Sequence, residues 1–91
     1  MRNDTGQLWE NYAIAERLKH KEYHQIFGAN YFWRTYDQQE IDWVEERDGN
    51  LFGYELKYKE QKVKTPPQWK KAYSKAKFKV ISKENYREWV I

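Results

Sequence analysis

Two β-forming stretches joined by an Asp-Gly turn constrain the fold of this chain more than any other feature. Residues 40–47 read EIDWVEER and residues 51–58 read LFGYELKY, with Asp48-Gly49-Asn50 between them. Asp-Gly is among the strongest short signals for a β-hairpin, because these residues accept the positive φ angles of the favoured two-residue turns. We therefore expect the chain to be organised around an antiparallel hairpin.

A two-residue turn at Asp48-Gly49 also sets the register of this hairpin. Arg47 then faces Asn50, and Asp42 faces Glu55. Opposed side chains have Cβ atoms about 4.5 to 5.5 Å apart, and like charges at such positions are destabilising. A four-residue loop gives the same register, whereas a three-residue loop with a bulge separates the two carboxylates.

A divalent cation explains why a chain would place two acids opposite each other. Mg²⁺ (or Mn²⁺) takes oxygen ligands, commonly one or two carboxylates plus waters and phosphate oxygens. It supplies phosphodiester hydrolysis with a Lewis acid and an activated water. Because side chains alternate, Lys57 lies on the face of Glu55, where it can stabilise charge developing on phosphorus. In the alternative, Lys57 and Lys59 neutralise the acids as a surface ion-pair ladder.

The opposite face of the hairpin is expected to form the core without help from the charged face. Its apolar members are Ile41, Trp43, Phe52, Tyr54 and Leu56.

The remaining pattern predicts the element order α-β-β-β-α-β around one sheet, a mixed α/β or α+β sandwich with an antiparallel meander flanked by helices. A helix over about 5–22 opens with a capping box at Asp4 and Gln7. Its apolar stripe, which must pack on something, consists of Leu8, Tyr12, Ile14, Ala15 and Leu18. The other expected elements are a strand at 31–36, a helix from Pro67 to about Ser74, a strand at 78–82 and a weak helical turn at 83–91.

Charge divides the chain into an acidic and a basic part. Residues 1–56 carry a net charge of −5 and residues 57–91 a net charge of +8. A basic segment of this density is an electrostatic footprint for polyanions such as nucleic acid, although lysines are also common on solvated faces. The lysines predicted to bind phosphates are Lys59, Lys62, Lys64, Lys70, Lys71 and Lys75.

Length and composition bound the remaining possibilities. The 91 residues suit one domain, and the absence of cysteine excludes disulfides and thiolate metal sites. This composition suits a reducing cytoplasm. No apolar run approaches the roughly 20 residues that cross a bilayer. There is also no GxxxxGK[ST] sequence, so this chain alone is not expected to hydrolyse ATP.

At this point the residues resemble a known superfamily. Asp42 in EIDWV followed by ELK at 55–57 on the next strand is similar to the PD-(D/E)XK nucleases, whose restriction-endonuclease-like core has the order α-β-β-β-α-β. GQLWENYAIAERLK, the run from Tyr31 to Glu60 and FKVISKENYREWV more narrowly resemble the uncharacterised C-terminal domain of a family of bacterial and archaeal AAA-type ATPases. The resemblance covers nearly the whole chain.

The resemblance implies a role for individual residues. It makes Asp42 and Glu55 metal ligands, Lys57 the catalytic lysine and Glu10, in LWEN, the glutamate that the superfamily often adds from its first helix. The alternative places Glu10 as an exposed carboxylate facing Arg17. Some members carry a glutamine and a tyrosine four apart on the following helix, whereas here Gln68 and Tyr73 are five apart.

Three functions are therefore open at the level of sequence. The first is a Mg²⁺-dependent nuclease domain acting on DNA, accessory to the N-terminal ATPase region of a parent protein. The second is an inactive module that binds nucleic acid, with Trp69, Tyr58 and Tyr73 as stacking groups, although such aromatics are more often core. The third is a protein-interaction domain that docks on the ATPase region.

Overall fold

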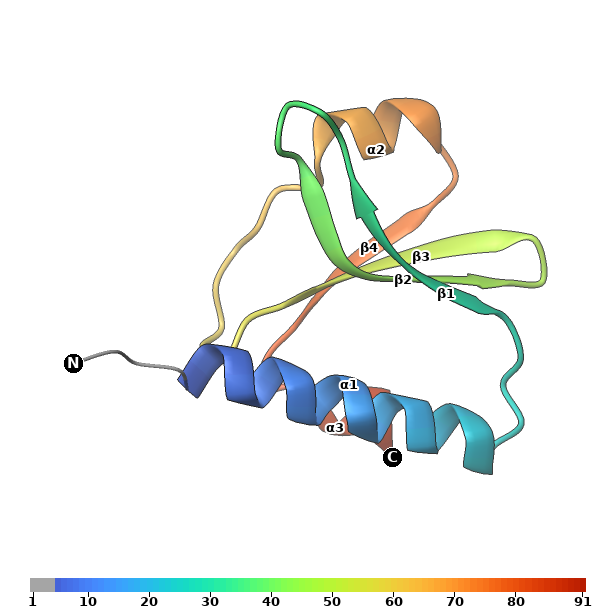
Figure 1. Cartoon of the computed structure of the whole chain (residues 1–91), viewed down its shortest axis with the longest axis vertical. Coiled ribbons are helices and arrows are strands. Elements are labelled where there is room, and N and C mark those ends of the chain that lie inside the picture. Colours follow the sequence, from blue (N-terminus) through green and yellow to red (C-terminus); the bar gives the residue numbers. More distant parts are fainter. Residues whose placement is uncertain (1–4) are drawn as a thin grey trace. The chain divides into compact units, whose positions relative to one another are not determined.

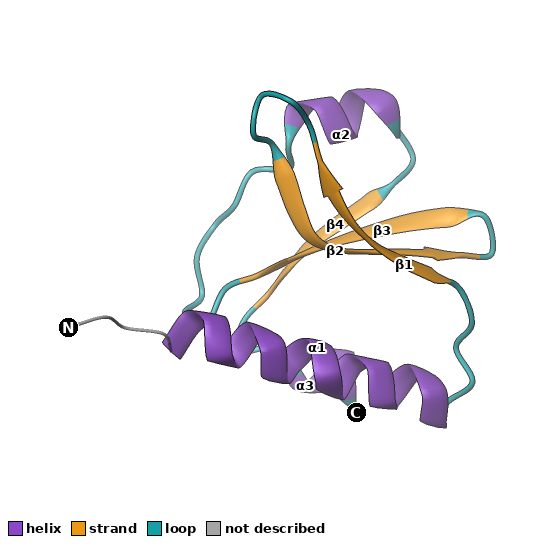
Figure 2. Ribbon diagram, in the orientation of Figure 1, coloured by secondary structure: helices purple, strands orange, loops and turns teal. Residues whose placement is uncertain are grey.

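The computed structural model describes residues 5–91 and contains one four-stranded sheet and three helices in that range (Figures 1 and 2). The elements in chain order are α1 (Thr5–Tyr23), β1 (Ala29–Arg34), β2 (Glu40–Arg47), β3 (Asn50–Leu56), α2 (Pro67–Ala72), β4 (Lys77–Ile81) and α3 (Arg87–Val90). The sheet is mixed, with strand order β1-β2-β3-β4. The predicted mixed α+β architecture is confirmed. None of the described helices has the length and apolar character needed to cross a membrane.

The chain divides into two compact units. The helical unit takes in the chain up to Phe27 together with Leu56–Gln61 and Ile81–Ile91, and the sheet unit takes in Gly28–Glu55 and Lys62–Val80. The helical unit therefore holds α1 and α3, and the sheet unit holds α2 and most of the sheet.

The hairpin of β2 and β3 has the register that the turn predicts. Arg47 pairs with Asn50 and Val44 pairs with Gly53. The two turn residues between them, Asp48 and Gly49, have φ angles of 52° and 79°. Both values lie in the left-handed region that the favoured two-residue hairpin turns require, so local turn chemistry sets this register.

A β-bulge interrupts the other side of β2. Tyr31 pairs with Val44, but Trp33 pairs with Ile41, so two residues of β2 face one residue of β1. Because of the extra residue, Ile41 lies on the same face as Val44 and packs with it. The sequence predicts that Ile41 shares a face of the hairpin with Trp43, and the bulge makes this prediction wrong.

The core of the sheet unit forms on the Ile41 face. Ile41, Val44 and Trp69 are buried there, and the partly buried side chains packed against them are Trp33, Leu51, Ala76 and Phe78. Trp69 comes from α2, which Pro67 begins at its first turn, as predicted. Gly53 lies opposite Val44 without a side chain, and a Cβ there would approach Ile41 and Trp69 to 3.3 Å. The absent side chain therefore leaves room for the indole.

Several predicted boundaries shift by one or two residues. The first strand covers Ala29–Arg34 rather than 31–36, and Tyr36 is fully exposed in the following turn. In that turn Thr35 N donates to Gln39 O at 2.8 Å. The strand predicted over 51–58 ends at Leu56, and α2 ends at Ala72 instead of about Ser74.

The helix predicted over 5–22 is present, but the stripe predicted to be buried is wrong. Leu8, Tyr12 and Leu18 are 66%, 49% and 42% exposed. The buried residues of α1 recur every four positions and are Ala13, Arg17 and Lys21. Asp4, the predicted cap, lies outside the described residues.

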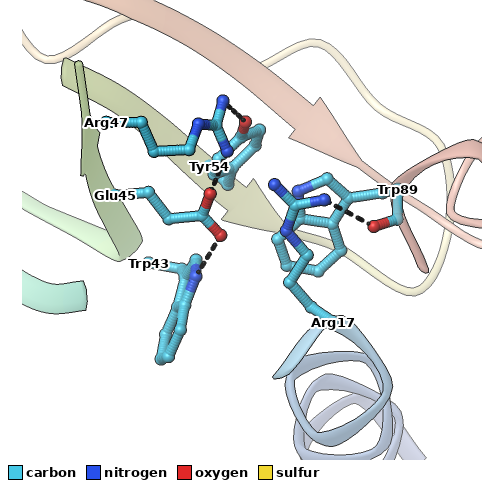
Figure 3. A network of polar contacts seen from close by, with 6 residues as sticks. All are labelled: Arg17, Trp43, Glu45, Arg47, Tyr54 and Trp89. Carbon is cyan, nitrogen blue, oxygen red and sulfur yellow. Dashed lines mark hydrogen bonds and ion pairs between the residues drawn. The ribbon is translucent and has the colours of Figure 1, made fainter. Parts of the chain in front are cut away.

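Arg17 is buried because α3 offers it both an acceptor and an aromatic ring. Its Nη1 donates to Trp89 O at 2.8 Å, and its Cζ lies 5.2 Å from the centroid of the Trp89 ring (Figure 3). A charge-assisted hydrogen bond and a cation–π contact offset the cost of removing the guanidinium from water.

We expect replacement of Gly28 by alanine to destabilise the fold. Gly28 has a φ of +154°, and a Cβ there would lie 2.1 Å from Glu46 O. The free energy of unfolding should fall by about 1–3 kcal/mol, measured by urea denaturation. Gly6→Ala is the control, because no atom lies within 4 Å of a Cβ at that position. An equal loss in both variants would contradict this explanation.

The turn between β1 and β2 predicts a dependence of stability on pH. Hydrogen bonds lower the pKa of Asp37 from its ordinary value of 3.8, chiefly the one that Thr35 donates. Gln68 Nε2 of α2 also donates to Asp37, at 3.0 Å. When the pKa of a carboxyl group is lower in the folded protein than in the unfolded protein, its ionisation stabilises the fold. This stabilisation is complete above the pKa of the unfolded state and is lost as the pH falls through the pKa of the folded state.

We therefore expect Asp37→Asn to lower the melting temperature above about pH 5 and to have little effect near about pH 2. Circular dichroism melts of both proteins across this range measure the difference. A difference that is constant with pH would show that the charge of Asp37 is not the cause.

Candidate functional site

A pocket in the helical unit contains two of the residues singled out from the sequence. Glu10 of α1 and Lys57 line one hollow of about 490 Å³, and both are half-buried. The other lining residues are Thr5, Gly6, Leu56, Tyr58, Lys59 and Gln61. The sequence places Glu10 and Lys57 far apart, and the fold brings them to one cavity.

Backbone hydrogen bonds hold the segment that carries Lys57. Lys57 N donates to Ile81 O at 2.9 Å, and Lys83 N donates to Tyr58 O at 3.2 Å. Lys57 is the first residue after β3, so it follows a strand end and is positioned by its neighbour from the end of β4. These bonds fix the backbone of Lys57 at the wall of the hollow.

Aromatic packing positions α1 beside the same segment. The Trp9 ring makes edge contacts with Tyr58 and Tyr86, with centroids 6.1 and 6.0 Å apart. Lys83 Nζ lies 4.9 Å from the centroid of the Tyr58 ring. Glu10 directly follows Trp9, so these contacts set the place of the glutamate on the pocket wall.

The pairing of β2 with β3 ends at Trp43 and Tyr54, one position short of the predicted pair Asp42 and Glu55. Asp42 precedes Trp43, Glu55 follows Tyr54, and both are half-buried. Oε1 of Glu55 is buried. Asp42 lies in the β-bulge, so the bulge, rather than simple alternation, sets the direction of its carboxylate.

No group of three or more histidine, cysteine, aspartate or glutamate side chains converges as a metal cluster within residues 5–91. The cation expected at Asp42 and Glu55 therefore remains a prediction from strand register.

Sequence reasoning missed a buried polar network on the face of β2 opposite Ile41. Glu45 is fully buried, and its carboxylate accepts hydrogen bonds from Trp43 Nε1 at 2.9 Å and from Arg47 Nη1 (Figure 3). Arg47 Nη2 also donates to Tyr54 Oη at 3.4 Å, and its Cζ lies 3.9 Å from the Phe52 centroid. The available signal was the alternation of EIDWVEER, which puts Glu45 on the face of Trp43.

The lysines predicted to contact phosphates are all exposed. They are Lys59, Lys62, Lys64, Lys70, Lys71 and Lys75. Of the three aromatic residues considered for base stacking, Trp69 is 1% exposed and belongs to the core, whereas Tyr73 is 40% exposed. Tyr58 is half-buried against Trp9. Only Tyr73 therefore offers a well-exposed ring.

Gln68 has a structural role in the sheet unit. Its backbone N donates to Gln39 Oε1 at 3.1 Å, and its side chain donates to Asp37. These bonds tie the start of α2 to the turn that follows β1. Figure 1 shows α2 beside that turn.

A second hollow, in the sheet unit, is lined mainly by aromatic side chains. Trp33, Trp69 and Tyr73 contribute to it, and Tyr31 and Glu46 stand at its side. Tyr31 donates its hydroxyl to Glu46, and this hydrogen bond raises the pKa of Tyr31 above its ordinary value of 10.0. The hydroxyl therefore stays protonated as a donor at neutral pH.

Comparison with known proteins gives one family and no individual relatives. No curated protein and no solved structure matches this chain. The match to a family model covers residues 5–88, which include every described helix and strand except the last residues of α3. The chain belongs to the family described as Domain of unknown function (DUF4143), an uncharacterised domain often found with AAA ATPases.

Proposed function

We propose that this domain is a metal-dependent, nuclease-like module that acts on or binds DNA beside an AAA-type ATPase. The observation that supports the proposal most is the shared pocket of Glu10 and Lys57 in the helical unit. The element order from α1 to β4 agrees with the order α-β-β-β-α-β that the resemblance to these nucleases predicts, and it supports the proposal. The family's frequent association with ATPases supports the proposed partner.

The proposed chemistry is phosphodiester hydrolysis. Asp42 and Glu55 supply carboxylate oxygens, the ligand type that Mg²⁺ and Mn²⁺ prefer. When bound, such an ion supplies a Lewis acid and an activated water. Lys57 donates to a phosphate oxygen as negative charge develops there, and one residue separates it from Glu55. The resemblance to the PD-(D/E)XK nucleases gives Glu10 the role of the additional glutamate from the first helix.

An inactive module that binds nucleic acid is the first alternative. Such a module needs the exposed lysines but not the carboxylates. A cleavage assay therefore separates it from a nuclease, and the salt dependence of DNA affinity tests the lysines. The six exposed lysines support this alternative as well as the first proposal.

A protein-interaction role has its own supporting observation. The apolar stripe of α1 is exposed, with Leu8 at 66% and Leu18 at 42%. Exposed apolar residues that share one helix face are typical of docking surfaces. In this alternative the ATPase region of a parent protein covers the stripe.

We expect the isolated chain to cleave DNA in the presence of Mn²⁺ or Mg²⁺ and Lys57→Ala to lower the rate about 10²- to 10³-fold, as loss of one charge-stabilising donor does. Asp42→Ala, Glu55→Ala and Glu10→Gln should also reduce cleavage. Gel assays on single- and double-stranded DNA measure the rates, and circular dichroism verifies folding.

Glu22→Gln and Lys19→Ala are the matched controls, since both change exposed α1 residues outside the pocket. Absence of cleavage by the unmodified chain with either metal contradicts the enzymatic proposal. Equal rates for Lys57→Ala and Lys19→Ala contradict the assigned role of Lys57.

We expect DNA binding to weaken steeply with salt because exposed lysines contact phosphates. Each contact removed should reduce the slope of log affinity against log salt by about 0.9 for duplex and about 0.7 for single strands. The double variant Lys70→Ala/Lys71→Ala should therefore show a flatter slope in fluorescence anisotropy titrations. Lys19→Ala should leave the slope unchanged, and an equal effect of both variants would contradict a role for α2.

A further inference from the structure

Two histidines lie one helical turn apart at the end of α1, and they are the only histidines of the chain. The backbone N of His24 donates to His20 O at 3.0 Å, so the helical hydrogen-bond pattern continues through His24. The two ring centroids are 4.5 Å apart, with an angle of 52° between the ring planes. Both rings therefore project to the same side of the helix.

This separation is close to the one that a shared metal ion requires. Zinc lies about 2.0–2.1 Å from an imidazole nitrogen, and tetrahedral coordination then places two ring centroids about 5 Å apart. The observed 4.5 Å differs from this by about half an ångström, which small rotations of the two side chains provide. Histidines at i and i+4 on one helix are also the spacing that zinc-binding helices use.

Both histidines reach the surface of the helical unit. His20 is half-buried and its Nδ1 is buried, so Nε2 is the nitrogen that the proposal assigns to the metal. His24 is exposed, and the edge of the Tyr23 ring stands against it with centroids 5.1 Å apart. Both histidines line a hollow of about 350 Å³, together with Lys19, Tyr23, Val90 and Ile91.

The cationic neighbour in this hollow has a carboxylate partner. Lys19 Nζ lies 2.8 Å from Glu16 Oε2. The attraction directs the ammonium toward Glu16 and reduces its repulsion of a bound cation.

We propose that His20 and His24 form a two-imidazole site for a late first-row divalent cation, Zn²⁺, Ni²⁺ or Cu²⁺, with water in its remaining coordination positions. Imidazole nitrogens suit these ions, whereas Mg²⁺ prefers oxygen. The site is separate from the proposed carboxylate site and does not depend on nuclease activity.

Isothermal titration of the untagged chain tests the proposal. We expect one equivalent of Zn²⁺, Ni²⁺ or Cu²⁺ to bind, with Cu²⁺ the tightest, and no heat from Mg²⁺ at this pair. His24→Ala should weaken binding about tenfold or more, because the second ligand no longer acts at high effective concentration. In proton NMR, Zn²⁺ should shift the ring signals of both histidines.

The matched control keeps two histidines but changes their spacing. His24→Ala/Gln25→His moves the second imidazole to a position with a φ of 54°, which histidine tolerates. Binding should remain as weak as in His24→Ala. The proposal is overturned if the unmodified chain binds no better than His20→Ala/His24→Ala, or if the respaced variant binds as tightly as the unmodified chain.

Discussion

The extra residue in β2 is the constraint on which the sheet unit depends. Simple alternation would put Ile41 on the face of Glu45, whereas the bulge returns it to the face of Val44. One apolar core then forms around Trp69, and the opposite face is left to the polar network of Glu45 and Arg47. A buried carboxylate is tolerated there because hydrogen-bond donors surround it. The one extra residue in β2 therefore leaves one face of the sheet apolar and the other polar.

Local chemistry accounts for the parts of the fold that the sequence predicted well. The hairpin register followed from Asp48 and Gly49 because two residues with positive φ leave few alternatives. The end of β1 was wrong because Thr35 turns away from the strand to bond Gln39 and Asp37. The bulge was missed because EIDWVEER contains no glycine or proline that would mark an irregular position in β2.

Helix α1 shows the limit of hydrophobic periodicity. Its length was predicted, but its buried face follows Ala13, Arg17 and Lys21 instead of the leucines. Arg17 finds its acceptor at Trp89, 72 residues along the chain, and no local pattern contains that contact. Long basic side chains can bury their stems when a distant carbonyl receives the charged end. The more apolar stripe is consequently left on the surface.

The residues of the candidate site came from the resemblance, and the structure brings only two of the four into one pocket. The resemblance named Glu10 and Lys57, and the structure places both on one pocket wall, whereas the bulge governs Asp42. The charges also occupy different environments: the acids Asp42 and Glu55 are half-buried on strands, and the six lysines are exposed. Salt screens exposed charges more strongly than partly buried ones. The proposed binding of a polyanion and the proposed chemistry on it therefore depend on different sets of residues, so substitutions can test them separately.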